Sequence, residues 1–499
     1  MRWSSWWALI LPIIIFCIPF LVLANQNTII IIGDDLSPDF LGFTEGATDT
    51  ATIPNLESLA KAGIRFTNVW SNPVCSPTRA GMLTGRYSFR TGIGNAVIGA
   101  TTPQLDTSEV TLAKLLQKFA PTRYATACIG KWHLHTGTPA NLNNPNILGF
   151  DFYAGNFNGA LPDYYQYSRV TNGVSDLVNV YATTQTVNDA LAWITSVKNQ
   201  KPFFLWLALN APHLPIHLPP VNLTTVKGLS GTTQDMAANP RAYYKASIEA
   251  MDTEIGRLLL ALKTQNLYDS TNIIFMGDNG SPAQVAHVSG TGRSKESIYD
   301  YGSHVPFVVA GPMVARGGRV SSALINGQDL FATIAEMSGF TRWDSLLVAQ
   351  KITYDAKSFL PVLKDQVATA RTWIFSELFT PVVTSNDGKS IRNQNYHLLQ
   401  FDDGREAFYN LVVDPSENSN LLQSPLSPDA KIEYQFLCSE LTNLLGKPRC
   451  KSVVSLLNRG LAGKSPTGPA STRLYDSQGR YLSVIIRSII FLYRPHSLH

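Results

Sequence analysis

The sequence predicts an α/β fold: a large, doubly wound, mostly parallel sheet flanked by helices, then a smaller C-terminal antiparallel sheet with a packed helix. Short apolar runs rich in branched residues, typical of strands buried on both faces, alternate with helical patterns. The apolar runs are Thr28 to Ile32, Tyr124 to Ile129, Pro202 to Leu209 and Asn272 to Met276. The helical patterns are Leu105 to Phe119, Val187 to Ser196 and Tyr243 to Leu262.

Polar residues follow each of the four apolar runs directly. These segments are Gly33-Asp34-Asp35, Gly130-Lys131-Trp132-His133, Asn210-Ala211-Pro212-His213 and Gly277-Asp278-Asn279-Gly280. Ligands of open α/β sheets bind outside the carboxyl ends of the strands, so all four segments should meet at one edge. Taken singly, the two aspartates could cap a helix and Asp278-Asn279 could form a turn. Their convergence on one edge favours a functional site.

The segment Cys75-Ser76-Pro77-Thr78-Arg79 predicts a helix that starts at Cys75. Pro77 suits a first helical turn, and the helix should continue to Gly85. Free N–H groups at a helix start favour an anion beside Cys75, and Arg79, one turn later, lies on the same face. These residues alone also allow a buried structural cysteine or a low-pKa thiol nucleophile.

The same residues carry a family resemblance. The core Cys75-x-Pro77-x-Arg79, with Leu83-Thr84-Gly85 downstream, resembles the motif that is oxidised to formylglycine in arylsulfatase-type sulfatases of the alkaline phosphatase superfamily. The resemblance covers roughly residues 27 to 445. It implies that a formylglycine-generating enzyme modifies Cys75, and that Arg79 holds the charge of the modified residue.

The resemblance also implies a metal site. Asp34, Asp35, Asp278 and Asn279 match the family's four protein ligands, and the modified Cys75 would face the same ion. Carboxylate and amide oxygens are hard ligands that select Ca²⁺ or Mg²⁺ over zinc. We expect Ca²⁺, with Mg²⁺ as the alternative, and we expect the ion to polarise the sulfate ester.

Basic side chains complete the site that the resemblance implies. Lys131 and His133 lie in a segment close to the second sulfatase signature, and His213 lies in a Pro-His-x-Pro element. Lys295 precedes a loop of the family pattern. Lys131, His213 and Lys295 would bind sulfate. His133 would act as a base, and His213 or Lys295 would assist the leaving oxygen.

Two segments depart from the family pattern. His135 stands where the family usually has glycine, which could narrow the site or contribute to substrate binding. In the loop after Lys295, Asp300 and Tyr301 replace a Glu and the first Gly of a Glu-Gly-Gly element, and His304 replaces an Arg. These changes leave the substrate class open, whereas the chemistry is carried by the other residues.

The expected reaction is hydrolysis of a sulfate monoester. The formylglycine hydrate at position 75 would attack sulfur in line and expel an alcohol. His133 would then remove a proton from the remaining hydroxyl, so that sulfate leaves by elimination and the aldehyde reforms. Elimination explains the need for an aldehyde, because an ordinary serine sulfate would require a second hydrolysis.

Three other functions are alternatives to this one. A phosphonate or phosphodiester hydrolase of the same superfamily could use the same nucleophile and metal. A secreted, non-catalytic glycan-binding relative would keep Cys75 unmodified. A two-zinc phosphohydrolase would need a Thr or Ser nucleophile and further Asp and His ligands, which the matching positions lack.

The partner of the site would be a sulfated small molecule or glycan. Charged glycans, steroid-like sulfates and aryl sulfates are all compatible with the residues named so far. Aromatic residues around Phe152 to Tyr167 could stack on a sugar or an apolar leaving group, or could equally belong to the core.

The N-terminus predicts a targeting segment over residues 1–24. Arg2 precedes an apolar run from Trp6 to Leu23 that ends in Ala24. This pattern favours a signal peptide, with an uncleaved membrane anchor as the alternative. The mature chain would be secreted, periplasmic or lumenal, with membrane contact only through an uncleaved segment. In such a compartment Cys438 and Cys450 are near enough in sequence for a disulfide.

With 499 residues, the chain exceeds the usual size of one core. We expect a catalytic domain over residues 25–375, a small α+β subdomain over 376–460 with a helix near Asp429 to Leu445, and a divergent tail over 461–499. The net charge of +4 is weak, and no Lys/Arg-rich block is present, so nucleic acid is not an expected partner.

Overall fold

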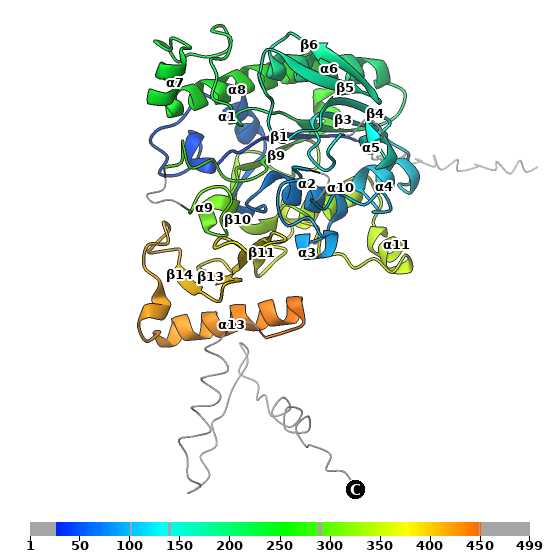
Figure 1. Ribbon diagram of the computed structural model, residues 1–499. Helices are drawn as coiled ribbons and strands as arrows, with labels where there is room; N and C mark the ends of the chain where they lie inside the picture. Colours follow the sequence, from blue (N-terminus) through cyan, green and yellow to red (C-terminus); the bar gives the residue numbers. More distant parts are fainter. Residues whose placement is uncertain (1–25, 100–101, 138–140, 288–291, 449, 451–499) are drawn as a thin grey trace, which may run out of the picture. The chain divides into compact units, whose positions relative to one another are not determined.

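A ten-stranded sheet forms the centre of the computed structural model (Figure 1). The structure describes residues 26–99, 102–137, 141–287, 292–448 and 450; the expected signal peptide and the tail lie outside them. The strands follow the order β10-β2-β9-β8-β1-β7-β3-β4-β5-β6. Their bounds are β1 Asn27–Gly33, β2 Ile64–Trp70, β3 Ala125–Lys131, β4 Phe152–Asn156, β5 Tyr167–Thr171, β6 Val174–Val178, β7 Phe203–Ala208, β8 Thr271–Gly277, β9 Phe307–Ala310 and β10 Arg319–Asn326.

The four predicted strands are neighbours in this sheet. β8, β1, β7 and β3 lie side by side and are all parallel, with Ile30 of β1 paired to Trp206 of β7 and to Ile274 of β8. Antiparallel pairs occur where β9 joins β8 and β2, and where β4, β5 and β6 follow one another. The sheet is therefore mostly parallel in its centre and mixed towards its edges, and the predicted fold class is confirmed.

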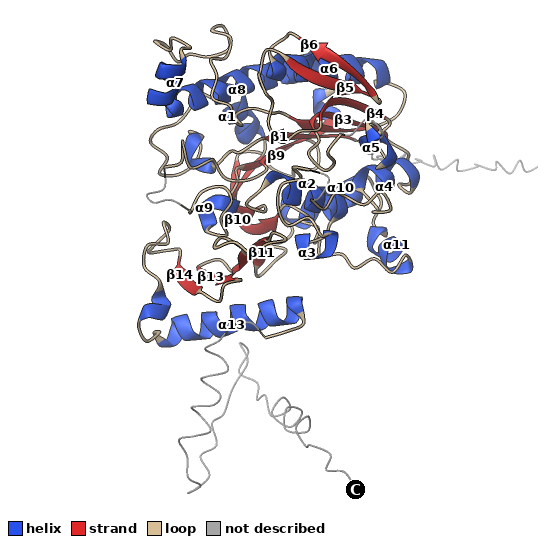
Figure 2. Ribbon diagram, viewed as in Figure 1, coloured by secondary structure: helices blue, strands red, loops and turns tan. Residues whose placement is uncertain are grey.

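Helices cover both faces of the large sheet, and this is why the central strands are apolar throughout. Ile30 and Ile32 of β1 pack into one core, whereas Ile29 and Ile31 pack into the other. α2, α4 and α10 contribute to the first core, and α1, α6 and α8 to the second (Figure 2). The helix bounds are α1 Pro54–Ala62, α2 Cys75–Thr84, α3 Ser88–Thr91, α4 Leu112–Lys118, α5 Asn144–Ile147, α6 Ala182–Val197, α7 Thr233–Ala238, α8 Pro240–Thr264, α9 Asp300–Ser303, α10 Asp329–Met337, α11 Trp343–Ala349, α12 Leu360–Leu363 and α13 Pro428–Leu445, with 3₁₀ turns η1 Pro38–Phe40, η3 Tyr268–Ser270 and η4 Leu421–Gln423.

The C-terminal part forms the predicted small antiparallel sheet with its helix. Its strands pair in the order β11-β12-β13-β14, with bounds β11 Ile374–Leu378, β12 Gly388–Arg392, β13 Tyr396–Phe401 and β14 Glu406–Asn410. α13 starts where the Ser427 side chain accepts a hydrogen bond from the Ala430 N–H, and it ends at Gly446 in the left-handed conformation. Tyr434 of α13 packs edge-on against Phe408 of β14, with ring centroids 5.4 Å apart.

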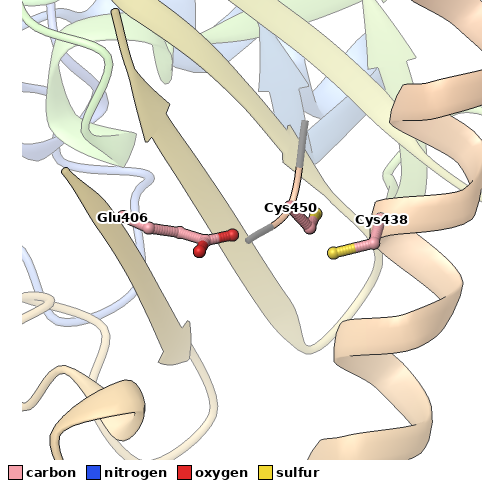
Figure 3. Close-up of side chains that lie close together, drawn as sticks. All are labelled: Glu406, Cys438 and Cys450. Carbon is pink, nitrogen blue, oxygen red and sulfur yellow. The ribbon is translucent and has the colours of Figure 1, made fainter. Parts of the chain in front are cut away.

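The described cysteines fall into two classes. Cys75 and Cys128 are free and buried, and Cys128 belongs to the first core. Cys438 and Cys450 are disulfide-bonded. Cys438 projects from α13 near Glu406 of β14 (Figure 3), but a disulfide sulfur is not a thiolate ligand, so this pair makes no metal centre. Within the described part of the chain, no helix is both long and apolar enough to cross a membrane.

Glu377 is a buried carboxyl group on β11. One of its oxygens accepts a hydrogen bond from the Phe89 N–H, and the other has no hydrogen-bond partner among the described residues. Burial raises the pKa of Glu377 to about 7, although Lys389 acts in the opposite direction. The folded chain therefore retains a proton that the unfolded chain loses near its ordinary pKa of about 4.5.

We expect Glu377→Gln to remove a pH dependence of stability. For a raised carboxyl pKa, the stability present below about pH 4.5 is lost as the pH rises towards 7, by up to about 3 kcal/mol. The neutral amide cannot undergo this loss. The stability of the variant relative to that of the wild type, measured by chemical denaturation, should be clearly higher at pH 8 than at pH 5. An equal difference at both pH values would contradict the account.

Candidate active site

The carboxyl ends of the central strands bring the predicted polar residues to one edge of the sheet. β1 leads into Asp34 and Asp35, β8 leads into Asp278, and β3 leads into His133. Asp35 and His133 have φ values of 65° and 56°, which is left-handed backbone. This conformation costs about 1–3 kcal/mol for a residue with a β-carbon and is common at functional sites. The turns thus redirect the side chains immediately after the strands.

Cys75 is the first residue of α2, as the sequence predicts, and only 2% of its surface is exposed. Its Sγ lies 3.0 Å from Nδ1 of His133. The neighbouring Ser76 hydroxyl donates to the His133 carbonyl at 2.7 Å and so ties the start of α2 to the end of β3. No side chain caps this helix, so its first N–H groups are not claimed by a capping oxygen.

Arg79 links the same helix to the carboxylates. Its Nε and Nη2 both donate to Oδ2 of Asp278, at 3.1 and 2.7 Å, and its Nη1 donates to the Lys131 carbonyl at 2.8 Å. Nη2 also lies 3.8 Å from Oδ1 of Asp34. The side chains of Arg79, Asp278 and Asp34 are fully buried, so the guanidinium is a structural part of the site as well as a source of positive charge.

The four oxygen-bearing residues predicted as metal ligands lie together, all fully buried. Lys131 Nζ donates to Oδ2 of Asp34 at 2.6 Å, and Asn279 Nδ2 donates to Oδ1 of Asp35 at 2.7 Å. Among the described residues, Oδ1 of Asp34 and Oδ1 of Asn279 have no hydrogen-bond partner. Ligand atoms of Asp34, Cys75 and Asp278 all lie within 4.8 Å of one another. Unpartnered hard oxygens in so small a volume fit a Ca²⁺ or Mg²⁺ ion.

The carboxylates differ in how well their charges are compensated. Burial and the neighbouring Asp278 raise the pKa of Asp34 well above its usual value. Burial also acts to raise the pKa of Asp278, but Arg79 beside it lowers the value overall. Asp35 is buried as well, yet the nearby His213 and Lys295 lower its pKa. The negative charge of Asp34 is therefore the least well compensated of the three.

His133 is held as a neutral imidazole. Burial, followed by the nearby Lys131, lowers its pKa well below the ordinary value. Sequence reasoning missed the residue that makes room for its ring, Gly159. A β-carbon at Gly159 would lie 2.4 Å from Cε1 and 2.6 Å from Nε2 of His133. Gly159 stands in the loop after β4, and nothing in the sequence pattern distinguishes it from an ordinary loop glycine.

His213 and Lys295 form the opposite wall. His213 Nδ1 lies 2.7 Å from the Leu214 carbonyl, so this nitrogen carries the proton and Nε2 accepts from Lys295 Nζ at 3.2 Å. Burial lowers the pKa of His213 to about 4. Lys295 also lies 2.7 Å from Oδ1 of Asp35; despite burial, that carboxylate raises the pKa of Lys295.

The aromatic cluster noted in the sequence acts mostly as a core. The Tyr164 hydroxyl lies 2.6 Å from the Asn210 carbonyl and 2.7 Å from the His213 carbonyl, so it supports the histidine loop from behind. His217 stacks on Tyr164 and does not line the pocket described next. Phe157 is the one member of the cluster that lines it.

These reactive groups face a pocket of about 620 Å³. Cys75, His133, His213, Lys295 and Asp35 line its reactive end. Its remaining lining residues are Val74, Ala96, Val97, Ile98, Gly99, His135, Thr136, Phe157, Asn158, Gly159, Ala160, Leu214, Pro282, Ala283, Gln284 and Glu296. Lys131 and Arg79 are fully buried and do not line this pocket.

The loop that departs from the family pattern faces elsewhere. Asp300 accepts hydrogen bonds from Trp70 Nε1 at 2.8 Å and Arg392 Nη1 at 3.0 Å. Tyr301 donates to Asp39, and His304 Nε2 donates to the Thr67 carbonyl. Asp300, Tyr301 and His304 line a second cavity of about 580 Å³ and do not line the first. Asp300 thus joins the loop to the small sheet through Arg392, whereas Tyr301 and His304 join it to Asp39 and to Thr67 of β2. His135, in contrast, does line the reactive pocket.

The fold, with a polar, cysteine-containing site at the carboxyl edge of its sheet, is that of the alkaline phosphatase superfamily. A family model described as Sulfatase matches residues 26–340, and the chain belongs to the sulfatase family. It is a sulfuric ester hydrolase.

Individual relatives agree with this assignment. The chain is 28% identical over 476 residues to human N-acetylgalactosamine-6-sulfatase, covering 84% of each chain. It is 26% identical over 333 residues to mouse arylsulfatase J, covering 63% of this chain and 53% of that protein. The solved structure of the protein named Ps i-CgsB superposes with a TM-score of 0.69 at 26% identity, covering 84% of this chain and 92% of that one.

We expect Gly159→Ala to impair catalysis more than stability. The added methyl group would displace the His133 ring, which lies beside Cys75. For a ring with the role expected from the sequence, misplacement by about 1 Å can lower the rate roughly 100-fold. Steady-state kinetics with a chromogenic aryl sulfate should show a lower kcat, whereas thermal denaturation should change little.

Gly99→Ala is the matched control, because it lines the same pocket and no described atom lies within 4 Å of its added β-carbon. Equal activity of the two variants would show that the space beside His133 is not needed.

Proposed function

We propose that this sulfatase cleaves sulfate monoesters with an oxidised Cys75 as nucleophile and one divalent cation beside it. The observation that carries the proposal is the clustering of Cys75 with the carboxylates of Asp34 and Asp278, at the edge of the sheet where Oδ1 of Asp34 and Oδ1 of Asn279 have no hydrogen-bond partner among the described residues. A buried cysteine with only a structural role would not need three carboxylates and three cationic side chains around it.

Asp34, Asp35, Asp278 and Asn279 are the proposed metal ligands. Their donor atoms are oxygens, which favours Ca²⁺, with Mg²⁺ as the alternative. When bound, the ion would supply positive charge that polarises the sulfate ester and stabilises negative oxygen. Lys131 holds Asp34 by its 2.6 Å hydrogen bond, and Arg79 holds Asp278, so each fixes one ligand in position.

The Sγ atom of Cys75 stands in for an oxygen of the proposed formylglycine hydrate. That group would supply a hydroxyl nucleophile and, through its second hydroxyl, a way to release sulfate with return of the aldehyde. His133 Nδ1 lies within hydrogen-bond distance of this position, and its lowered pKa keeps the ring able to accept a proton. A formylglycine-generating enzyme is the proposed maturation partner.

His213 and Lys295 are the proposed groups on the leaving-alcohol side. Overall, water is consumed, the bond between sulfur and the alcohol oxygen breaks, and that oxygen gains a proton. Lys295 is held protonated beside Asp35, and His213 Nε2 is in contact with it, so the pair can deliver this proton. Lys131, Lys295 and Arg79 would together compensate the charge of the sulfuryl group in the transition state.

The proposed substrate is a sulfated small molecule or glycan, and the proposed location is outside the cytoplasm. The relative named N-acetylgalactosamine-6-sulfatase supports a sulfated sugar. Disulfide-bonded Cys438 and Cys450, together with the N-terminal targeting pattern, support an oxidising compartment. We propose that the catalytic domain spans residues 25–375 and that the small subdomain spans residues 376–460.

We expect sulfatase activity to depend on oxidation of Cys75. When the chain is expressed with a formylglycine-generating enzyme, mass spectrometry of the tryptic peptide Phe66–Arg79 should find an aldehyde. Cys75→Ala should lower kcat by about three orders of magnitude or more, as expected for loss of a nucleophile.

Cys128→Ala is the matched control: Cys128 is the other described free cysteine, lies in the core and should not affect the chemistry. If only thiol were found after co-expression and sulfate esters bound without turnover, a non-catalytic binding protein would be the better description. Dominant turnover of a phosphodiester of the same alcohol would instead favour the phosphohydrolase.

We expect Ca²⁺ to bind to the carboxylates at this edge of the sheet. The binding can be measured without an activity assay. Adding Ca²⁺ to chelator-treated protein should raise the melting temperature, because an ion that binds only the folded state stabilises it. Asn279→Ala removes one oxygen ligand and should reduce this shift. Absence of a shift with either Ca²⁺ or Mg²⁺ would contradict the metal site, and a shift with Mg²⁺ alone would change the identity of the ion.

A further inference from the structure

The outer part of the reactive pocket has an unusual charge pattern for an enzyme that binds anions. Apart from its reactive end, the pocket is lined by apolar or uncharged side chains, with Glu296 as the exception. Ile98 is 82% exposed at this pocket, and Phe157 offers a further apolar surface. Asn158 and Gln284 supply amide groups. The outer pocket therefore suits a neutral group with some apolar surface and some hydroxyls.

Positive charge is absent from this outer region. Among the described lining residues, Lys295 is the one lysine or arginine, and it is already paired with Asp35 at 2.7 Å. Burial lowers the pKa of His135, so this side chain is mostly neutral at pH 7. The internal segments 100–101, 138–140 and 288–291 contain no charged residue in the sequence. A second anionic group on a substrate would find no counter-charge here.

Glu296 is fixed in place by its backbone. Its N–H donates to the Pro73 carbonyl at 2.9 Å, and its carbonyl accepts from Asn386 Nδ2 at 3.1 Å. Its φ of 68° is left-handed, a conformation that is costly for glutamate and is held here by these contacts. The residue directly follows Lys295, its side chain is exposed, and both residues line the pocket.

We propose that this pocket selects sulfate monoesters whose leaving alcohol carries no further negative charge, and that Glu296 is the residue that rejects anionic alcohols. The proposal rests on the proposed function of the site. A carboxylate or second sulfate on the alcohol would lose water without gaining a cationic partner and would be repelled by Glu296. Hydroxyl groups can instead donate to the Glu296 carboxylate and bond with the amides of Asn158 and Gln284.

Two aryl sulfates of similar size separate charge from shape: 4-(hydroxymethyl)phenyl sulfate and 4-carboxyphenyl sulfate. Their dissociation constants are measured by calorimetry on the Cys75→Ala variant, in which the ester stays intact. We expect the neutral ester to bind about tenfold more tightly or better, and added salt to reduce this ratio because it screens the charges. In the Cys75→Ala background, Glu296→Gln should reduce the ratio at least threefold, and Glu296→Lys should reduce it further.

Glu45→Gln is the matched control, because Glu45 is an exposed glutamate that lines the second cavity. It should leave the ratio unchanged. Equal affinity for the two esters, or a ratio that Glu296→Gln does not alter, would overturn the proposal. Turnover of the neutral ester by the oxidised wild-type enzyme is measured in parallel. Its absence would count against the proposed function alone, because the binding ratio does not depend on chemistry.

Discussion

The buried ion pair between Arg79 and Asp278 is the interaction on which the site depends. It joins α2, whose first residue is Cys75, to the carboxylates at the end of β8, 199 residues further along the chain. An unpaired charge in this position would be strongly destabilising, so the helix can dock only where the carboxylate meets it. Arg79 also binds the Lys131 carbonyl, which extends the same constraint to β3. One guanidinium thereby aligns three segments that are distant in sequence.

The small sheet supports this arrangement from the other side. The Ser376 hydroxyl of β11 donates to the Ser71 carbonyl at 2.9 Å and contacts Ser303 of α9 at the same distance. The Phe375 N–H donates to Asn326 at the end of β10. The Phe379 N–H donates to the Gly94 carbonyl, in the segment that precedes Ile98 and Gly99 of the pocket wall. The C-terminal part is thus joined to the carboxyl edge of the large sheet. None of its described residues lines the reactive pocket, but Leu378 and Leu399 belong to the same buried apolar cluster as Cys75.

The central strands could be predicted from the sequence because they are buried on both faces and therefore apolar at every position. β8, β1, β7 and β3 have this pattern. The residues that follow them were expected to converge because parallel strands present their carboxyl ends at one edge of the sheet. β2 and β10 are partly exposed and carry polar residues, and β5 and β6 are short antiparallel strands near one edge. The pattern of apolar residues in these strands is therefore too weak to predict them from the sequence. The predicted helix at Leu105 to Phe119 was too long, because α4 begins only at Leu112, where Thr111 caps it.

The candidate site likewise contains residues that the sequence predicts and residues that it does not. Residues that carry charge in a recognisable motif can be proposed as site residues from the sequence alone. Gly159 leaves space for the His133 ring, and Tyr164 donates hydrogen bonds to backbone carbonyl groups of the histidine loop. No local sequence pattern identifies either residue. The direction in which Asp300 and His304 face could not be read from the chain either, because it depends on Trp70 and Arg392, which belong to other strands.

The burial of α2 has a consequence for the order of events in the life of the chain. All of its ten residues, from Cys75 to Thr84, are buried against the rest of the protein. A second enzyme cannot grasp this segment as an extended peptide once the helix has docked. The proposed oxidation must therefore precede folding. The yield of active molecules would then depend on how fast the maturation enzyme modifies the nascent chain relative to how fast that chain folds.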